Sequence, residues 1–273
     1  MKKKTLKIIA GITAAAILLG LGWFSNALIG NPISKMLATR TAEKYLAETY
    51  SDTDFYIDTL GYSFKEVGYY AHIKSPTSED SSFTLHLNMT GSLNYDDFEH
   101  RVLNRSNTAN RLNMAYRELV DTVLESPSFP YTTDISFGDL EFRHDVEADA
   151  IAEYPYAIRI NELELDKVYD LSDLGADAGH LCLYVDHDTV SAESMAQILL
   201  DIKNIFDEAG VRFYAADVVL RYPKVNEDTP RKEGRMEVCA FLYRDIFEDG
   251  LVERVQAAND AANAYHAEQD AKK

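Results

Sequence analysis

An uncharged, apolar stretch lies close to the start of the chain. Residues 8–29 contain no charged side chain, and Lys2, Lys3, Lys4 and Lys7 precede them. As a helix, this stretch would rise roughly 33 Å, which is enough to cross a bilayer core of about 30 Å. Because basic residues are enriched on the cytoplasmic side of membrane helices, the pattern predicts a single-pass anchor with a cytoplasmic N-terminus and an extracytoplasmic body.

A cleaved signal peptide is the alternative interpretation of the same stretch. A basic start and an apolar run, followed by small residues at Ser25 and Ala27, fit such a peptide. The apolar run is longer than the roughly 7–15 residues usual for a signal peptide, which favours a retained anchor. Trp23 and Phe24 also stand where aromatic residues line a membrane interface. Both interpretations place residues 31–273 outside the cytoplasm, whereas a third, a helix buried within a soluble protein, does not.

After the apolar stretch, the spacing of apolar residues is first typical of a helix and then typical of strands. Apolar residues recur with helical spacing over residues 32–50, and a second helix with an apolar stripe is predicted over residues 108–124. Between them, aromatic and β-branched runs predict three strands, over residues 55–64, 69–73 and 82–87. This order, α-β-β-β-α, predicts an antiparallel sheet with helices on one face.

The C-terminal half has a second set of regular patterns. A helix is predicted over residues 192–209, with Ser191 as its N-cap, and a final helix begins at a capping box over residues 245–248. Weaker strand-like runs occupy residues 135–142 and 156–165, on either side of the acidic segment 145–153, and residues 170–175 are predicted as a loop. The clearer strands cover residues 181–185, 212–222 and 235–243.

These elements predict an α+β protein with a domain boundary near Pro127. The predicted parts are an N-terminal transmembrane anchor over residues 1–30, an α-β-β-β-α domain over residues 31–126, and an α+β domain over residues 127–273. The last of these contains a β-α-β-β-α unit, and both sheets are expected to be antiparallel or mixed.

Three short segments resemble a known family. They are residues 30–34 (GNPIS), residues 42–46 (AEKYL) and residues 69–78 (YYAHIKSPTS). In these segments the chain is similar to the YfjL-like family, which is made up of membrane-anchored proteins of unknown function from Gram-positive bacteria. The resemblance implies a bacterial cell-envelope setting, and it brings no catalytic residues.

The charge of the chain excludes one class of binding partner. There are 27 basic and 45 acidic residues, and the formal net charge is -18, although four of the basic residues precede the apolar stretch. The body is therefore strongly acidic and is repelled by phosphate backbones, so we expect no nucleic-acid binding. The apolar fraction of 46% is sufficient for packed cores.

The most distinctive candidate surface lies on the predicted N-terminal sheet. Tyr70, His72 and Lys74 share one face of their strand, and Thr84 and His86 share the matching face of the next strand. With a turn centred near residues 78–79, the two imidazoles would lie nearly opposite each other, where they could bind a metal or respond to pH. The alternative is that these residues only decorate a solvated sheet face. No helix is predicted over this face, so we treat it as a candidate contact surface.

A weaker candidate metal site follows a predicted strand. Asp186, His187 and Asp188 stand between a strand and a helix, where α/β proteins often place ligands, and their side chains could coordinate a cation. The same residue types are also ordinary turn and cap residues.

The two cysteines allow two interpretations. Cys182 and Cys239 both point to the less apolar side of their strands, and in a split β-α-β arrangement these strands would be neighbours. A disulfide is then sterically allowed, and an exported domain would permit it. Two separate reduced thiols are the alternative.

The sequence favours a binding protein over an enzyme. It contains no glycine-rich phosphate loop, no HExxH motif and no GxSxG motif, and it predicts no cofactor. We therefore expect a non-catalytic, membrane-anchored module with an envelope protein as its partner. The alternative is an extracytoplasmic hydrolase with a metal or carboxylate site near Asp186.

Overall fold

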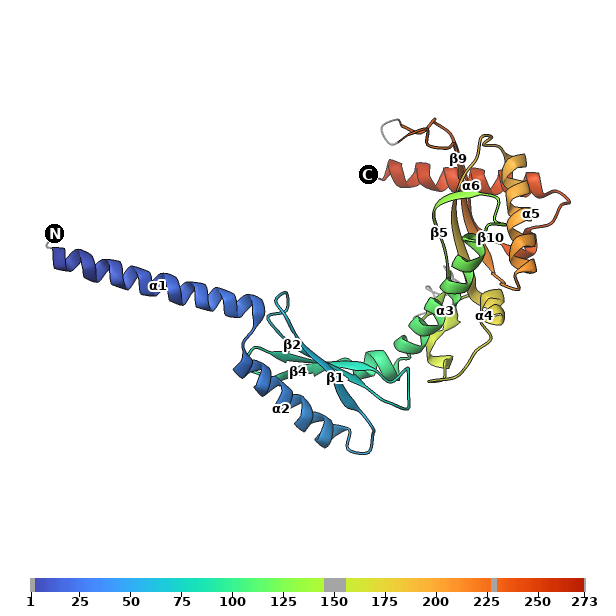
Figure 1. Cartoon of the computed structure of the whole chain (residues 1–273). Helices are drawn as coiled ribbons and strands as arrows, with labels where there is room; N and C mark the ends of the chain where they lie inside the picture. The colour runs from blue at the N-terminus through green and yellow to red at the C-terminus, as the bar shows by residue number, and fades with distance from the viewer. Residues whose placement is uncertain (1–2, 145–155, 227–229, 273) are drawn as a thin grey trace. The chain divides into compact units, whose positions relative to one another are not determined.

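The computed structural model of the chain describes residues 3–144, 156–226 and 230–272, without the side chains at 3–6, 23 and 25–27. These residues form two compact units, which are described separately below: unit 1 extends to Thr108, and unit 2 begins at Ala109. The predicted acidic segment 145–153 lies outside the described residues. Figure 1 shows the element labels used below.

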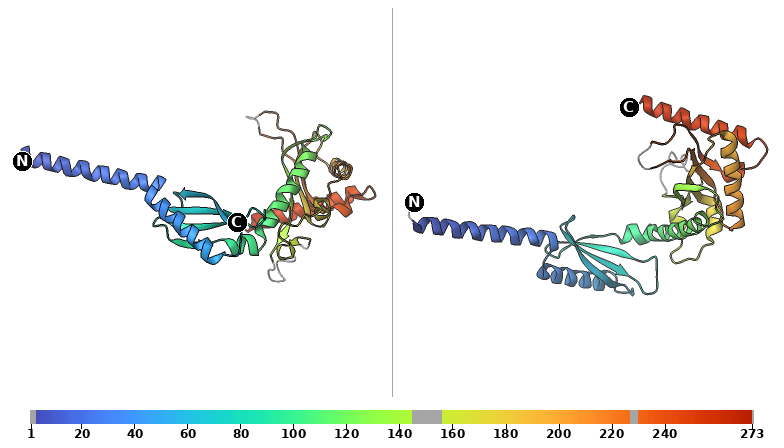
Figure 2. Two further views of the ribbon diagram at one scale, coloured as in Figure 1. Left: turned by 60° about the horizontal axis from the view of Figure 1, so that its bottom comes forward. Right: turned by 45° about the horizontal axis from the view of Figure 1, so that its top comes forward.

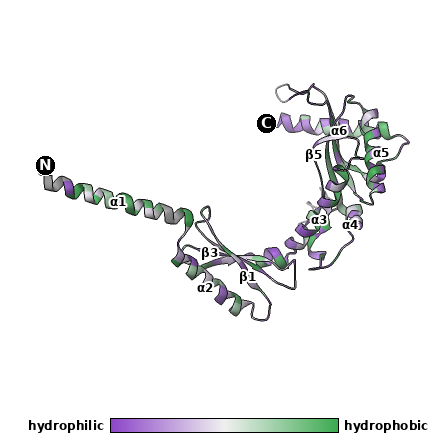
Figure 3. Ribbon diagram, viewed as in Figure 1, coloured by the Kyte–Doolittle hydropathy of each residue, from purple (hydrophilic) through white to green (hydrophobic). Residues whose placement is uncertain are grey.

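Helix α1 (Lys3–Ile29) contains the apolar stretch found in the sequence. Every side chain from residue 7 to residue 22 is exposed, and Leu18 and Leu19 are 69% and 75% exposed. Figure 3 shows the predominantly hydrophobic colour of this helix. Among the residues that the structure describes, no helix combines the length and the apolarity that a membrane span requires.

The rest of unit 1 is one helix packed on an antiparallel sheet. Its elements are α2 (Pro32–Thr49), β1 (Tyr56–Ser63), β2 (Gly68–Lys74), β3 (Phe83–Asn88) and β4 (Leu93–Asp96), and the strand order is β1-β2-β3-β4. Asn31 caps α2, and its side chain accepts a hydrogen bond from the backbone N–H of Ser34. Figure 2 shows α2 lying along one face of the sheet.

The predicted helix and three strands of this unit are confirmed, but two elements were not predicted. Strand β4 and the short π-helix η1 (Glu99–Leu103) follow β3. Phe98, which lies between them, joins the aromatic core, because its ring lies 5.1 Å from that of Phe83 and 5.0 Å from that of Tyr50. The predicted inward face of β3 is confirmed, with Leu85 fully buried.

Unit 2 is built on a mixed sheet with the order β10-β9-β8-β5. Strands β8 and β9 are parallel and are joined by α5, whereas β5 and β10 pair antiparallel with their neighbours. The elements of the sheet and its connections are β5 (Thr132–Leu140), β8 (Gly179–Asp186), α5 (Ala192–Glu208), β9 (Ala215–Arg221) and β10 (Arg235–Leu242), and β6 (Phe142–Arg143) and β7 (Ile158–Arg159) form a separate parallel pair.

The core of unit 2 lies on one face of this sheet. Strand β8 alternates, so Leu181, Leu183 and Val185 are fully buried while the residues between them are half-buried. Helices α3 (Ser106–Leu124), α5 and α6 (Leu251–Ala271) contribute to the same apolar cluster. The other face of the sheet carries half-buried side chains of mixed polarity, among them Phe137, His180 and Val219.

Helix α3 packs in unit 2, although the sequence placed it before the domain boundary. Its apolar stripe, which includes Leu112, Tyr116 and Val120, belongs to the core of unit 2, and the Tyr116 hydroxyl donates a hydrogen bond to the carbonyl of Arg212. The contact-based division therefore falls between residues 108 and 109 instead of near residue 126. The helical pattern showed that α3 has an apolar stripe, but not which sheet that stripe covers.

Three local predictions for unit 2 are wrong. Residues predicted as a loop are a helix, α4 (Leu171–Ala178), capped by Asp170. Helix α6 begins after Gly250, which has a φ of 66°, and not at the predicted capping box. Strand β10 has an irregular register after Val238, so Phe241 is buried in place of Ala240, which has a φ of 46°.

Candidate functional site

The candidate surface on unit 1 is an open sheet face, but its two histidines do not pair. Tyr70 lies opposite His86, and His72 lies opposite Thr84, so the imidazoles are offset along the strands. The turn therefore lies close to its predicted position. Its register nevertheless places Tyr70, and not His72, opposite His86. A metal bridge between His72 and His86 has no support in this geometry.

His86 and Lys74 of this face instead have local neighbours. The His86 ring stacks on Tyr95 with a centroid distance of 4.4 Å, and its Nδ1 lies 3.5 Å from a carboxylate oxygen of Glu66. The Lys74 ammonium lies 3.0 Å from the Asp58 carboxylate. Surface pairs of this kind contribute little stability, so the face is chemically ordinary.

Two of the three candidate metal residues of unit 2, Asp186 and His187, bind arginines and a turn backbone instead. Oδ1 of Asp186 accepts hydrogen bonds from Arg221 at 2.9 Å and from Arg231 at 2.8 Å. Burial would raise the pKa of Asp186, but the hydrogen bonds and charges of the two arginines outweigh it and lower that pKa. The His187 ring contacts the backbone of Thr189, as in an ordinary turn. No group of three potential metal ligands occurs within the described ranges.

The two cysteines are separate thiols. Strand β9 lies between β8 and β10, so Cys182 pairs with Asp217 and not with the strand of Cys239. The β-α-β unit is therefore of the ordinary parallel type and not the split type that the disulfide prediction required. Burial and the nearby Asp217 raise the pKa of Cys182, and burial and Glu237 raise the pKa of Cys239 to about 12. Both thiols are thus poor nucleophiles.

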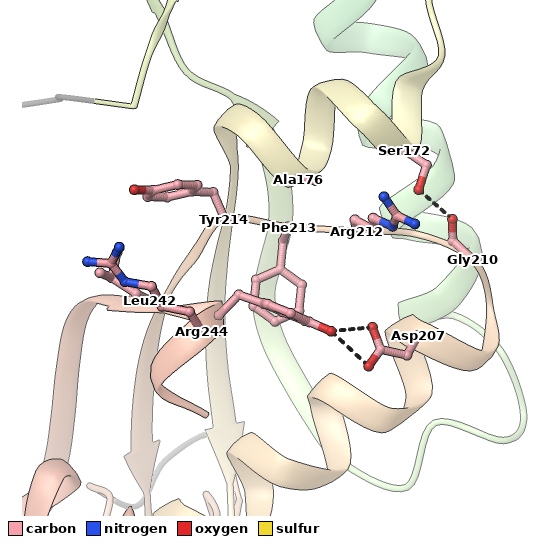
Figure 4. Close-up of a pocket in the computed structure, with 10 residues that line it drawn as sticks. Ser172, Ala176, Asp207, Gly210, Arg212, Phe213, Tyr214, Leu242 and Arg244 are labelled. Atoms are coloured by element: carbon pink, nitrogen blue, oxygen red, sulfur yellow. Dashed lines mark hydrogen bonds between the residues drawn. The ribbon is translucent and has the colours of Figure 1, made fainter. Parts of the chain in front are cut away.

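A pocket of about 620 Å³ lies at the opposite end of the unit 2 sheet from Asp186. Helix α4 and the end of α5 form one side, and the segments before β9 and after β10 form the other; we call this the α4–β10 pocket (Figure 4). Its volume falls within the range of small-molecule sites. The lining residues are Ser172, Ala176, Asp207, Gly210, Arg212, Phe213, Tyr214, Leu242, Tyr243 and Arg244.

A glycine allows α4 to form a wall of this pocket. A methyl group on Gly175 would lie 2.2 Å from the carbonyl oxygen of Arg212 and 2.6 Å from the Tyr116 ring. The helix can therefore approach the chain before β9 only with glycine at this position. The Ser172 hydroxyl then donates a hydrogen bond to the carbonyl of Gly210, which fixes the start of α4 against the end of α5.

Some polar groups of the pocket already form hydrogen bonds or ion pairs with other side chains, and others do not. The Tyr243 hydroxyl donates to both carboxylate oxygens of Asp207, at 2.8 and 2.9 Å. Burial, and to a lesser extent Asp207, raises the pKa of Tyr243 to about 12, so this donor stays protonated at neutral pH. Arg212 lies 3.4 Å from Asp173, whereas Arg244 forms no hydrogen bond or ion pair within the described residues.

A hydrogen-bonded network supports one wall of the pocket. The Tyr214 ring stacks on Tyr156 with a centroid distance of 4.5 Å, and the Tyr156 hydroxyl lies 2.8 Å from Nδ1 of His180. Nε2 of His180 lies 3.1 Å from Asp217, which also accepts the backbone N–H of Ala240. Burial would lower the pKa of His180, but Asp217, together with Glu141, outweighs it and raises that pKa.

Neither the pocket nor this network was predicted from the sequence. The pocket residues come from three separated segments, 172–176, 207–214 and 242–244, and none of them forms a recognisable motif. The prediction placed a ligand at the carboxyl ends of the parallel strands, where doubly wound sheets bind ligands. Here there is a single crossover, and the loop predicted at residues 170–175 is the helix that encloses the other end.

The fold and the pocket define a class of protein with two α+β units, one of which carries a ligand-sized pocket. A model of the YfjL-like N-terminal domain matches residues 2–97, and a model of the YfjL-like C-terminal domain matches residues 115–256. The chain belongs to the YfjL-like family. No curated protein and no solved structure matches it.

Proposed function

We propose that this chain is a membrane-anchored, extracytoplasmic binding protein whose ligand occupies the α4–β10 pocket. The observation that carries the proposal is the combination of an apolar floor, formed in part by Phe213 and Leu242, with a few polar groups at the rim. Ligand sites commonly have this composition, because apolar surface supplies affinity and a few polar groups supply orientation.

A binding role accounts for the polar groups better than catalysis does. The Asp207 carboxylate and the Tyr243 hydroxyl bind each other, and His180 is held between Asp217 and Tyr156. A metal-dependent hydrolase at Asp186 remains the alternative proposal, but two guanidinium groups already bind the Oδ1 atom that a cation would need.

The anchor part of the proposal is supported by the exposure of α1. A helix that exposes side chains such as Ile12 and Leu19 presents far more apolar surface than a water-soluble protein usually leaves uncovered. The uncharged sequence over residues 8–29 is also long enough to cross a bilayer as a helix. Trp23 and residues 25–27, on which the aromatic belt and the cleavage site depend, lie outside the described side chains.

The ligand part can be tested by native mass spectrometry of the full chain, purified from its own host in a neutral detergent. We expect the chain to carry an additional small-molecule mass, and we expect Ala176→Phe to remove it, because a phenyl ring there fills the pocket. The matched control is Ala264→Phe, on an exposed position of α6, which should keep the additional mass. An additional mass that survives in Ala176→Phe would contradict the proposal.

The anchor part needs a separate test of topology. Protease added to intact cells should remove residues 31–273, and the membrane fraction should retain the full chain before digestion. If the body resists protease in intact cells but is degraded after lysis, it faces the cytoplasm and the proposed location is wrong.

A further inference from the structure

The charges that line the α4–β10 pocket are unequal. The lining contains two cations, Arg212 and Arg244, and one anion, Asp207. The Tyr243 hydroxyl donates a hydrogen bond to the two oxygens of Asp207, and the carboxylate keeps its negative charge. In a chain with a formal net charge of -18, a pocket lining with one more cation than anions is a local exception.

Arg244 is the lining cation with the most unused hydrogen-bonding capacity. Arg212 forms an ion pair with Asp173. Both side chains are more than half exposed, so this pair is weak. Arg244 has no such partner among the described residues. Its guanidinium is planar and can form two parallel hydrogen bonds with a carboxylate, which makes it a specific anion receptor.

The aromatic residues beside Arg244 indicate the other part of the ligand. Figure 4 shows Tyr214 at the same end of the pocket as Arg244, with Arg212 at the opposite end. The Tyr214 ring is held by its stack on Tyr156, and Tyr243 is held edge-on against Phe213 at 5.2 Å. Rings that are fixed in this way lose little entropy when another ring packs on them.

We infer that the α4–β10 pocket takes a small ligand with an aromatic body and one anionic group, and that Arg244 binds the anion. This inference rests on the proposed function, because it assumes that the pocket is the ligand site. The ring of the ligand packs on the apolar floor beside Tyr214, and its carboxylate pairs with the Arg244 guanidinium. An aromatic cation would instead meet two arginines.

Isothermal titration of the full chain in neutral detergent with 2-naphthoate and its neutral analogue 2-naphthamide tests this inference. The two probes have the same ring and nearly the same shape, so their difference reports the charge. We expect 2-naphthoate to bind about tenfold more tightly, because a hydrogen bond to a charged group is worth more than a neutral one. Ala176→Phe should abolish the pocket-dependent binding of both probes, which separates it from partitioning into detergent or onto α1.

The variant Arg244→Gln should reduce the affinity for 2-naphthoate about tenfold and leave the affinity for 2-naphthamide unchanged. Arg212→Gln should have a smaller effect, because Arg212 is partly paired with Asp173. The matched control is Arg159→Gln, which removes an exposed arginine that pairs with Glu162 away from the pocket. A thermal melt for each variant verifies that it is folded.

The outcomes distinguish the inference from the proposed function. If both probes bind equally well and Ala176→Phe weakens both, the pocket is a ligand site but the anionic preference is wrong. If Arg244→Gln leaves the 2-naphthoate affinity unchanged, Arg244 is not the anion receptor. If neither probe shows binding that Ala176→Phe removes, the pocket does not take aromatic anions and the inference is wrong, whereas the proposed function is decided by the additional mass that wild type should carry and Ala176→Phe should lack.

Discussion

In unit 1, the polar face of the sheet carries exposed single ion pairs, whereas in unit 2 the polar face carries half-buried networks. The Lys74–Asp58 pair of unit 1 is about half exposed, while the His180 side chain of unit 2 is 12% exposed and lies between Asp217 and Tyr156. Both sheets have one apolar and one polar face, so alternation alone does not distinguish them. The difference is that the polar groups of unit 2 form a network that supports Tyr214, a wall residue of the pocket.

The two units also differ in how their cores are built. Unit 1 uses a group of aromatic rings around Phe83, and unit 2 uses an aliphatic cluster to which three helices contribute. Substitutions on the open face of unit 1 should cost little stability, because surface ion pairs contribute little to the free energy of unfolding. Changes in the networks of unit 2 are more costly, because they leave partly buried groups without partners.

The largest expected effect comes from Leu112→Ala in α3, which tests whether this helix belongs to unit 2. Leu112 is 2% exposed and lies in the core of unit 2, so its truncation should cost about 2–5 kcal/mol in the free energy of unfolding. Hydrogen exchange should accelerate in β8 and remain unchanged in β2. The converse variant, Leu87→Ala in β3, should accelerate exchange in β2 and β3 but not in β8, and faster exchange of β2 in Leu112→Ala would place α3 in unit 1.

A smaller effect is expected from Gly175→Ala, which tests the contact between α4 and the chain before β9. The added methyl group would meet the Arg212 carbonyl and the Tyr116 ring, so the helix must move outward, at a cost of about 1–3 kcal/mol. Denaturant unfolding of the full chain measures the cost. The comparison variant is Gly210→Asn, where no heavy atom lies within 4 Å of an added Cβ and φ is 70°, a value that asparagine tolerates. Equal stability of Gly175→Ala and wild type would mean that α4 does not pack as closely as described.

The His180 network should make the stability of unit 2 depend on pH. The pKa of His180 is raised in the folded state, so its contribution is fully present below the usual value of about 6.5 and is lost as pH rises through the folded value. The free energy of unfolding should therefore fall from pH 6 upward. In His180→Gln, which cannot gain the charge, this part of the decrease should disappear, and the loss at pH 6 should be about 1–3 kcal/mol. Parallel pH profiles of the two proteins would contradict the assignment.

The smallest effect on stability is expected for the double variant of Tyr70 and His72 on the open face of unit 1. Both are at least partly exposed, so Tyr70→Ser with His72→Ser should leave the thermal melt of the full chain nearly unchanged. If this face contacts an envelope protein, recovery of that protein in a pull-down should decrease. Unchanged recovery would mean that the polar face of unit 1 is only solvated.

The sequence predicted the elements better than their assembly. The alternation of β3 and the cap and apolar stripe of α5 are local patterns, and both are confirmed by the structure. The position of α3 and the strand order depend on contacts between distant residues, which no local pattern carries. Gly175 was interpreted as a loop residue, although its role is to let a helix approach the backbone closely.

The candidate sites also differ in whether local patterns or contacts between distant residues form them. The sequence predicted that Tyr70 and His72 share the less buried face of their strand, since alternation along a strand determines which side chains share a face, and the burial of β2 agrees with this. The α4–β10 pocket could not be predicted, because its ten lining residues are brought together only by the packing of α4, α5 and the ends of β9 and β10. The net charge of the chain is negative, so it gave no indication that a cation, Arg244, lines the pocket.

Hydrogen exchange of the full chain, with and without saturating 2-naphthoate, tests the central difference between the two units most directly. We predict slower exchange in residues 171–178 and 242–245, which border the α4–β10 pocket, and no change in residues 68–88 of unit 1. The protection should be absent in Ala176→Phe. Protection that persists in Ala176→Phe, or that appears in unit 1 and not at the pocket, would contradict the assignment of ligand binding to unit 2.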